Sequence, residues 1–131
     1  MNGLLLDTHT FLWWAIEPEK LPAGVLAALQ EPGTRIVFSA VSSWEAQIKV
    51  GLGKLVLKEP LQIIVERELI QNHWEVLPVY LQHTWKLKEL PPLHKDPFDR
   101  LLVAQALAED LTIVTKDPLV TMYSGLTILW A

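Results

Sequence analysis

Apolar and polar positions follow two periods along the chain, and together they predict alternating strands and helices. Short runs rich in Leu, Ile and Val, bounded by turn residues, are typical of buried strands. Three such runs and two weaker ones predict strands at residues 3–6, 35–38, 74–77, 111–114 and 126–130. Between them, apolar residues recur every three to four positions, as on a helix that covers a core. These stretches predict helices at residues 8–16, 22–30, 42–50, 61–72, 81–90 and 97–109.

The order of these elements predicts an α/β fold. Strands that alternate with helices pair in parallel, because each helix carries the chain back across one face of the sheet. We therefore expect a parallel sheet of four to five strands, flanked by helices on both faces. The sequence has no repeat, low-complexity segment or Gly/Ser linker, so residues 1–131 are expected to form a single domain. Ligands bind such sheets beyond the carboxyl ends of the strands.

The composition narrows the functional classes. Half of the 131 residues are apolar, which argues against disorder, and the lack of cysteine excludes disulfides and thiolate metal sites. The longest uncharged stretch, residues 118–131, is shorter than the roughly 20 residues that span a bilayer. No signal peptide is recognisable at the N-terminus, so we expect a cytoplasmic protein with no membrane contact.

The charge balance bears on nucleic-acid binding. With 15 acidic and 11 basic residues the net charge is −4, which disfavours binding through a broad basic surface. A nuclease stays open, because bound divalent ions reverse the sign of a local acidic pocket.

Acidic residues follow the predicted strands or begin the predicted helices. Asp7 comes directly after the first strand, and Asp117 follows the strand at 111–114 after two residues. Glu45 and Asp99 each stand near the start of a predicted helix. Because the carboxyl ends of parallel strands share one edge of the sheet, Asp7, Glu45 and Asp117 are expected there. The placement of Asp99 depends on the topology, which the pattern leaves open.

Each acid also has an explanation as a helix cap. Asp7 can cap the helix that follows it, and Ser42 with Glu45 has the spacing of a capping box. Asp96 and Asp99, in the stretch HKDPFD, match a capped helix start with proline at the first position. For any single acid, capping is the commoner role.

Asp99 is the acid that capping explains least well. The residues three, four and seven positions further on are Leu102, Val103 and Ala106, the apolar face of the helix. A carboxylate on the core side is costly unless it is paired or coordinated. Together the acids predict an acidic pocket, and oxygen-only ligands favour Mg²⁺ or Mn²⁺ over zinc. Such an ion can activate water for attack on a phosphodiester.

Four stretches resemble the motifs of one family. LLLDTHTFLWW, SSWEAQIK, HKDPFDRLLVAQA and TIVTKDP occur in the order and chain length of the PIN domain, and they are most similar to the VapC-type toxins of prokaryotic toxin–antitoxin pairs. The resemblance covers essentially the whole chain. It implies a PIN-like fold and an endoribonuclease that hydrolyses RNA phosphodiester bonds with Mg²⁺ or Mn²⁺. It also implies a cognate antitoxin as partner and a homodimer.

The resemblance assigns metal binding and catalysis to four acids. They are Asp7, Glu45, Asp99 and Asp117. In the family, the helix that bears the third acid points its start into the pocket. The first and third acids would hold the principal ion, while the second and fourth would position a second ion or orient the water.

Other residues near the motifs receive supporting or neutral roles. Thr8 and Thr115 resemble residues that support the site, whereas Asp96 lies outside the family's four positions and is kept as a helix cap or supporting group. Candidate phosphate contacts are Lys49, Arg100 and Lys116. His9 and His94 flank the motifs, but we expect neither to act, because an isolated histidine is usually structural or exposed.

Three other functions fit parts of the pattern. A phosphorelay receiver needs an acceptor aspartate after the middle strand, where this chain has Pro78, Val79 and Tyr80. A phosphatase with an aspartyl nucleophile typically has a second acid two residues after the first, where this chain has His9. The third alternative is a non-catalytic PIN-like module that binds protein or RNA. Four costly carboxylates kept together argue against a pure binder.

Overall fold

The computed structural model describes residues 3–131, in which the predicted parallel sheet is present. Its strands are β1 (Leu4–Leu6), β2 (Ile36–Ser39), β3 (Glu75–Leu77), β4 (Thr112–Thr115) and β5 (Ile128–Trp130). They lie in the order β3-β2-β1-β4-β5, and each neighbouring pair is parallel. The first strand therefore lies at the centre of the sheet. Strands β2 and β3 lie on one side of it, and β4 and β5 lie on the other.

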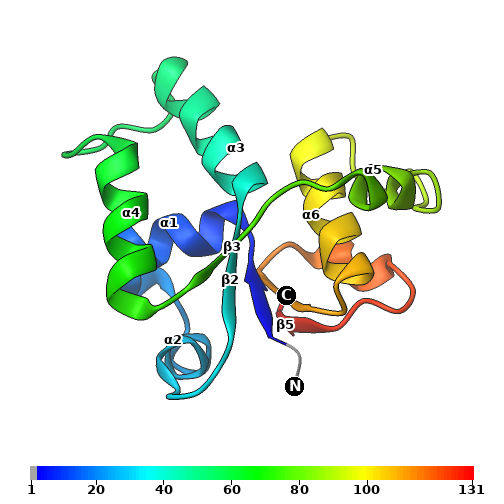
Figure 1. The fold of residues 1–131 in the computed structure, drawn as a ribbon, viewed down its shortest axis with the longest axis horizontal. Helices are drawn as coiled ribbons and strands as arrows, with labels where there is room; N and C mark the ends of the chain where they lie inside the picture. Colours follow the sequence, from blue (N-terminus) through cyan, green and yellow to red (C-terminus); the bar gives the residue numbers. More distant parts are fainter. Residues whose placement is uncertain (1–2) are drawn as a thin grey trace.

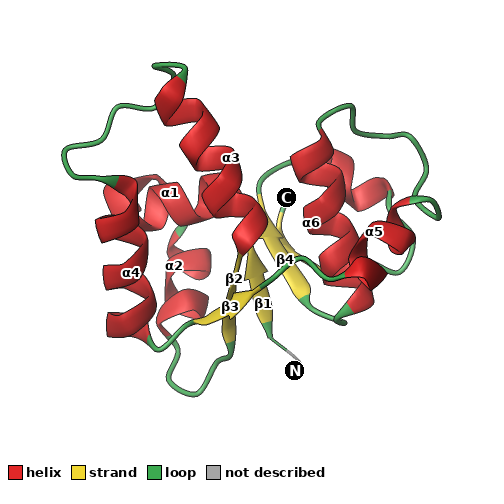
Figure 2. Cartoon of the chain, turned by 45° about the horizontal axis from the view of Figure 1, so that its top comes forward, coloured by secondary structure: helices red, strands yellow, loops and turns green. Residues whose placement is uncertain are grey.

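Helices cover both faces of this sheet. They are α1 (Thr8–Ile16), α2 (Ala23–Gln30), α3 (Ala40–Gly51), α4 (Leu61–Asn72), α5 (Leu81–Leu87) and α6 (Pro97–Ala108), with 3₁₀ turns η1 (Pro18–Lys20) and η2 (Pro118–Met122). Figures 1 and 2 show α1, α2 and α4 on one side of the sheet, α5 and α6 on the other, and α3 rising between the two groups. The predicted α/β architecture is confirmed. Within residues 3–131, no helix has the length and apolar character to cross a bilayer.

The sheet is buried on both faces, which explains why its strands are continuous apolar runs. Side chains alternate along β1, so that Leu4 and Leu6 pack into the core beneath α1, α2 and α4. Leu5 points the other way, into the core with Leu102 and Val103 of α6. The two halves of the chain are thus joined through one central strand.

Helix α3 begins earlier than the sequence predicts. Ser39, the last residue of β2, is its N-cap, and the Ser39 side chain accepts a hydrogen bond from the Val41 N–H at 3.0 Å. The predicted capping box of Ser42 and Glu45 is therefore wrong, because Glu45 lies in the second turn of the helix. The side chain of Glu45 is instead buried against α1, as described below.

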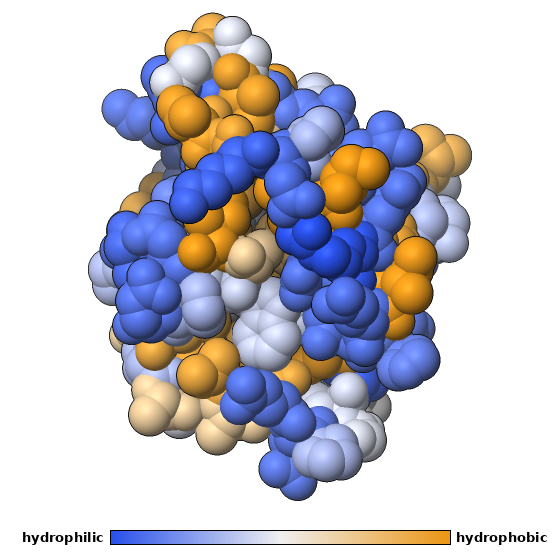
Figure 3. Space-filling view, turned by 90° about the vertical axis from the view of Figure 1, so that its left-hand side faces the viewer, coloured by the Kyte–Doolittle hydropathy of each residue, from blue (hydrophilic) through white to orange (hydrophobic). Residues whose placement is uncertain are grey.

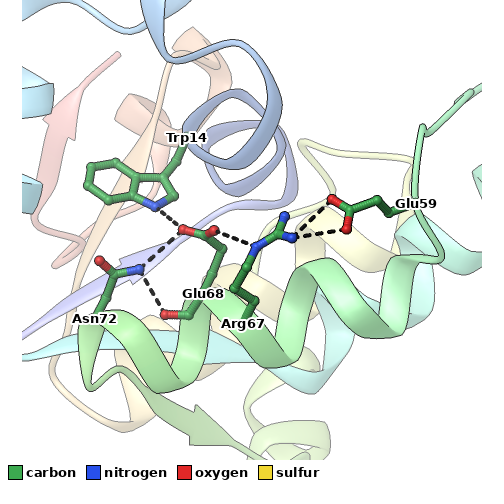
Figure 4. A network of polar contacts seen from close by, with 5 residues as sticks. All are labelled: Trp14, Glu59, Arg67, Glu68 and Asn72. Carbon is green, nitrogen blue, oxygen red and sulfur yellow. Dashed lines mark hydrogen bonds and ion pairs between the residues drawn. The ribbon is translucent and has the colours of Figure 1, made fainter.

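A network of polar side chains fastens α4 to α1 (Figure 4). The Trp14 indole N–H donates to the Glu68 carboxylate at 2.9 Å, and the Asn72 amide donates to the same carboxylate at 3.2 Å. On its other side, Glu68 lies 3.8 Å from Arg67, whose guanidinium also binds Glu59 at 3.0 Å. These contacts fix the orientation of α1, and the start of α1 forms one wall of the candidate site.

Candidate active site

A pocket beyond the carboxyl ends of β1 and β4 brings the four predicted acids together. It has a volume of about 370 Å³. Its lining comprises Asp7, His9, Glu45, Lys49, Asp96, Asp99, Lys116, Asp117 and Pro118. The acids come from the starts of α1 and α6, the second turn of α3 and the loop after β4, so the fold assembles them from four separate segments. This is the edge at which parallel α/β sheets bind ligands.

Three aspartates of the pocket are also helix caps. Oδ1 of Asp7 accepts a hydrogen bond from the Thr10 N–H at 2.7 Å, which caps α1. Asp96 caps α6 through the Phe98 N–H at 2.8 Å, and Asp117 caps η2 at 3.0 Å. Capping and a place in the pocket are therefore compatible, because each cap bond uses only one carboxylate oxygen.

Glu45 is the most buried of the acids, and it is held from two sides. Its carboxyl is buried, with 6% of the residue exposed. The Thr8 hydroxyl donates to Glu45 Oε1 at 2.6 Å and lies 3.1 Å from the Ser42 hydroxyl. Lys49, one turn further along α3, places its ammonium 3.4 Å from Oε2. Thr8 thus contacts this acid directly.

Asp99 is the acid with the strongly perturbed ionisation. Burial, followed by the negative charges of Asp96 and Glu45, raises the pKa of its carboxyl from 3.8 to about 6, against a smaller lowering by His94. A carboxyl with a raised pKa among like charges is typical of functional sites. The pocket therefore holds more negative charge than its own cations balance.

His94 is a part of the site that the sequence did not predict. The residue is buried; its Nε2 lies 2.6 Å from Asp117 Oδ2, and its Nδ1 lies 2.7 Å from the Tyr123 hydroxyl. The imidazole also stacks on the Tyr123 ring, with 5.5 Å between centroids. Single ligand atoms of His94, Asp99 and Asp117 all lie within 4.8 Å of one another. His94 is therefore buried and hydrogen-bonded beside Asp117, whereas His9 is exposed at the rim.

The remaining candidates differ in their orientation. Lys116 lines the pocket, and its ammonium lies 4.6 Å from the centre of the Trp13 ring, a cation–π contact that restrains it. The buried Thr115 hydroxyl accepts the Asp117 N–H at 3.1 Å and so shapes the loop that carries this acid. Arg100 instead donates to the carbonyl oxygens of Pro91 and Leu87, at 3.0 and 3.2 Å.

A parallel sheet in this order, with an acidic pocket at its carboxyl edge, defines the class of the protein. The family model of the PIN domain matches residues 4–120, and the chain belongs to this family. Ribonuclease VapC22 of Mycobacterium tuberculosis is 27% identical over 122 residues, which cover 89% of this chain and 88% of that protein.

Two solved structures share the fold over nearly the whole chain. VapBC2 from Rickettsia felis, bound to a DNA fragment from its promoter, superposes with a TM-score of 0.71 at 21% identity over 96% of each chain. DNA-bound VapBC from Salmonella typhimurium superposes with a TM-score of 0.72 at 19% identity over 98% of each chain. The PIN-like fold predicted from the four motifs is confirmed.

Proposed function

We propose that this protein is a VapC-type endoribonuclease that hydrolyses RNA phosphodiester bonds in the acidic pocket with a divalent cation. The observation that carries the proposal is the convergence of four carboxylates from separate segments in one pocket. Membership of the PIN family and the relation to ribonuclease VapC22 support RNA as the substrate.

The donor set fits a hard divalent cation. Carboxylate oxygens are the ligands that Mg²⁺ and Mn²⁺ prefer. Burial and the neighbouring acids raise the pKa of Asp99, and a bound cation would offset this cost of its charged form. The residues that would hold one or two ions are Asp7, Glu45, Asp99 and Asp117. A bound ion would stabilise the negative charge that develops on the phosphate during hydrolysis.

The chain's own side chains would position the substrate. Lys49 and Lys116 stand in the pocket lining, where their ammonium groups can bind the phosphate oxygens. Glu45, held by the Thr8 hydroxyl, can accept a hydrogen bond from the attacking water and orient it. Asp96 and Thr115 support the loops on either side.

The decisive experiment is cleavage of labelled single-stranded RNA by the purified full chain. We expect cleavage with Mg²⁺ or Mn²⁺ and none in EDTA, followed by recovery when the ion is added in excess. Cleavage that persists in the chelator would contradict a metal-dependent reaction. RNA that binds but stays intact with every divalent ion would favour the non-catalytic PIN-like module instead.

Thr8→Val is expected to lower the rate of RNA cleavage about tenfold, because it removes the hydroxyl that holds the buried Glu45 carboxylate. Thr8→Ser keeps this hydroxyl and is the matched control, which should retain most of the activity. Initial rates on the same RNA measure the effect. The melting temperature of each variant checks that it is folded at the assay temperature. An equal loss in both variants would contradict the hydroxyl as the cause of the effect.

We also propose an antitoxin protein as partner. Two of the solved structures that share this fold are VapBC complexes, which supports a partner of this type. Apolar atoms are visible at the top of the face in Figure 3. Val50 and Leu52 at the end of α3, and Val56 in the loop that follows, are exposed. Contiguous exposed apolar surface commonly marks protein interaction sites. The homodimer and the cytoplasmic location stay predictions from the sequence.

A further inference from the structure

We propose that His94 is a direct ligand of the divalent cation, together with Asp99 and Asp117, and that this nitrogen donor makes the pocket select Mn²⁺ over Mg²⁺. The inference rests on the proposed cation-binding pocket. It adds a ligand beyond the four acids and decides between the two ions.

The three side chains have the dimensions of one cation site. His94 lies in the loop before α6, Asp99 in the first turn of α6, and Asp117 after β4, and one ligand atom from each lies within 4.8 Å of the others. Ligands on opposite sides of an ion at about 2.1 Å are about 4.2 Å apart, and adjacent ligands about 3 Å. The 2.6 Å between His94 Nε2 and Asp117 Oδ2 has to widen by about 0.4 Å, and any pair at the 4.8 Å limit has to close by about 0.6 Å, shifts that side-chain rotation can supply.

The contact with Tyr123 allows His94 to bind an ion through an unprotonated Nε2. Without the ion, one tautomer of His94 satisfies both contacts: Nε2–H can donate to Asp117 while Nδ1 accepts the Tyr123 hydroxyl proton. With Nε2 on an ion, the ring proton sits on Nδ1 and is donated to the Tyr123 oxygen, since a hydroxyl both donates and accepts. Metal-bound histidines commonly have such a partner on the second ring nitrogen, which fixes the tautomer.

Burial and two hydrogen bonds hold the His94 ring in one orientation. Its side chain is 4% exposed, and the Tyr123 ring lies beside it, nearly parallel to the imidazole at 5.5 Å between centroids. Both ring nitrogens therefore face partners within the site, which leaves the ring little freedom to turn away. The imidazole is held in place before any ion arrives, which lowers the entropy cost of coordination.

An imidazole donor changes which ion the pocket prefers. Mg²⁺ takes oxygen ligands almost exclusively in proteins, whereas first-row transition metals accept nitrogen readily. A site with one imidazole and surrounding carboxylates thus has the negative charge that binds either ion. Its nitrogen donor favours Mn²⁺ over Mg²⁺.

Pulsed EPR of the full chain loaded with Mn²⁺ tests the ligand directly. We expect a ¹⁴N coupling from a bound imidazole, which changes to a ¹⁵N coupling when the protein carries ¹⁵N-labelled histidine. His94→Gln should lose this coupling. His9→Gln changes the histidine that lines the pocket itself and should keep the coupling. A wild-type spectrum with no nitrogen coupling at saturating Mn²⁺, or a coupling that depends on His9, would overturn the proposal.

Metal titration by calorimetry tests the selectivity. His94→Gln should raise the Kd for Mn²⁺ about tenfold and leave the Kd for Mg²⁺ nearly unchanged. An equal rise for both ions would show that His94 only shapes the pocket, and would overturn the selectivity claim. The EPR spectrum of the wild-type protein tests the histidine ligand even if the His94→Gln variant fails to fold. Because neither experiment measures cleavage, an inactive protein that shows the histidine coupling would contradict the proposed ribonuclease activity alone.

Discussion

Asp7→Asn is expected to lower divalent-dependent RNA cleavage at least about hundredfold while the fold stays intact. The substitution removes one negative charge from the pocket and weakens the bond to the cation. It keeps the helix cap, because an Asn side-chain oxygen can still accept the Thr10 N–H, and Asn caps helices as well as Asp does. Initial cleavage rates and the melting temperature in EDTA measure the two effects separately.

Asp110→Asn is the matched control for this variant. It makes the same chemical change at an exposed residue after α6, whose φ of 54° is a conformation that Asn tolerates. We expect its cleavage rate to equal that of the wild type. Unchanged activity in Asp7→Asn would refute the role of Asp7 as a ligand, and a large fall in melting temperature would show that the cap was lost as well.

The strands and most helices could be predicted because their signals are local. The strands are buried on both faces, so an unbroken apolar run is enough to place them. The start of α3 could not be placed, because Ser39, Ser42 and Ser43 are all acceptable caps and the spacing of Ser42 and Glu45 matches a capping box. The end of β2 decides the matter, since the helix begins directly after it.

The candidate site was predictable in part for the same reason. Asp7 and Asp117 follow strand ends, and a parallel sheet brings strand ends together. The place of Asp99 depends on where α6 begins relative to the sheet, which periodicity does not encode. His94 was missed because its partners are distant in sequence: Asp117 and Tyr123 come 23 and 29 residues later, beyond α6 and β4. The histidine at the start of the stretch HKDPFD was the signal that could have indicated a place for His94 in the site.

In EDTA at pH 8, Asp99→Asn is expected to raise the melting temperature by roughly 3–5 °C. Burial and the neighbouring acids raise the pKa of Asp99 from 3.8 to about 6, so its charged form is disfavoured in the folded state. The full pKa shift corresponds to about 3 kcal/mol. Because the carboxyl is only partly buried, solvent screening reduces the gain to roughly 1 kcal/mol. Asn carries no charge and avoids this cost.

The gain should depend on pH in a defined direction. Below about pH 4 the carboxyl is protonated in both the folded and the unfolded chain, so it does not affect the unfolding free energy. Between pH 4 and 6 the folded chain binds more protons, and the wild type loses stability as the pH rises. Above pH 6 the carboxyl is charged in both states, and the loss of stability from its burial no longer grows. In thermal unfolding at pH 4 and pH 8, the Asp99→Asn variant should therefore have a higher melting temperature than the wild type only at pH 8.

A bound cation should reverse this order. At a Mn²⁺ concentration of about 100 times Kd, the wild type gains about 2.7 kcal/mol in unfolding free energy, because the ion binds only the folded pocket. Asp99→Asn loses a ligand and should gain much less at the same concentration, so the wild type melts higher in Mn²⁺ and lower in EDTA. Asp110→Asn should follow the wild type in both conditions. An Asp99→Asn variant that melts below the wild type in EDTA at pH 8 would contradict the charge repulsion, and one that Mn²⁺ stabilises fully would contradict a ligand role for Asp99.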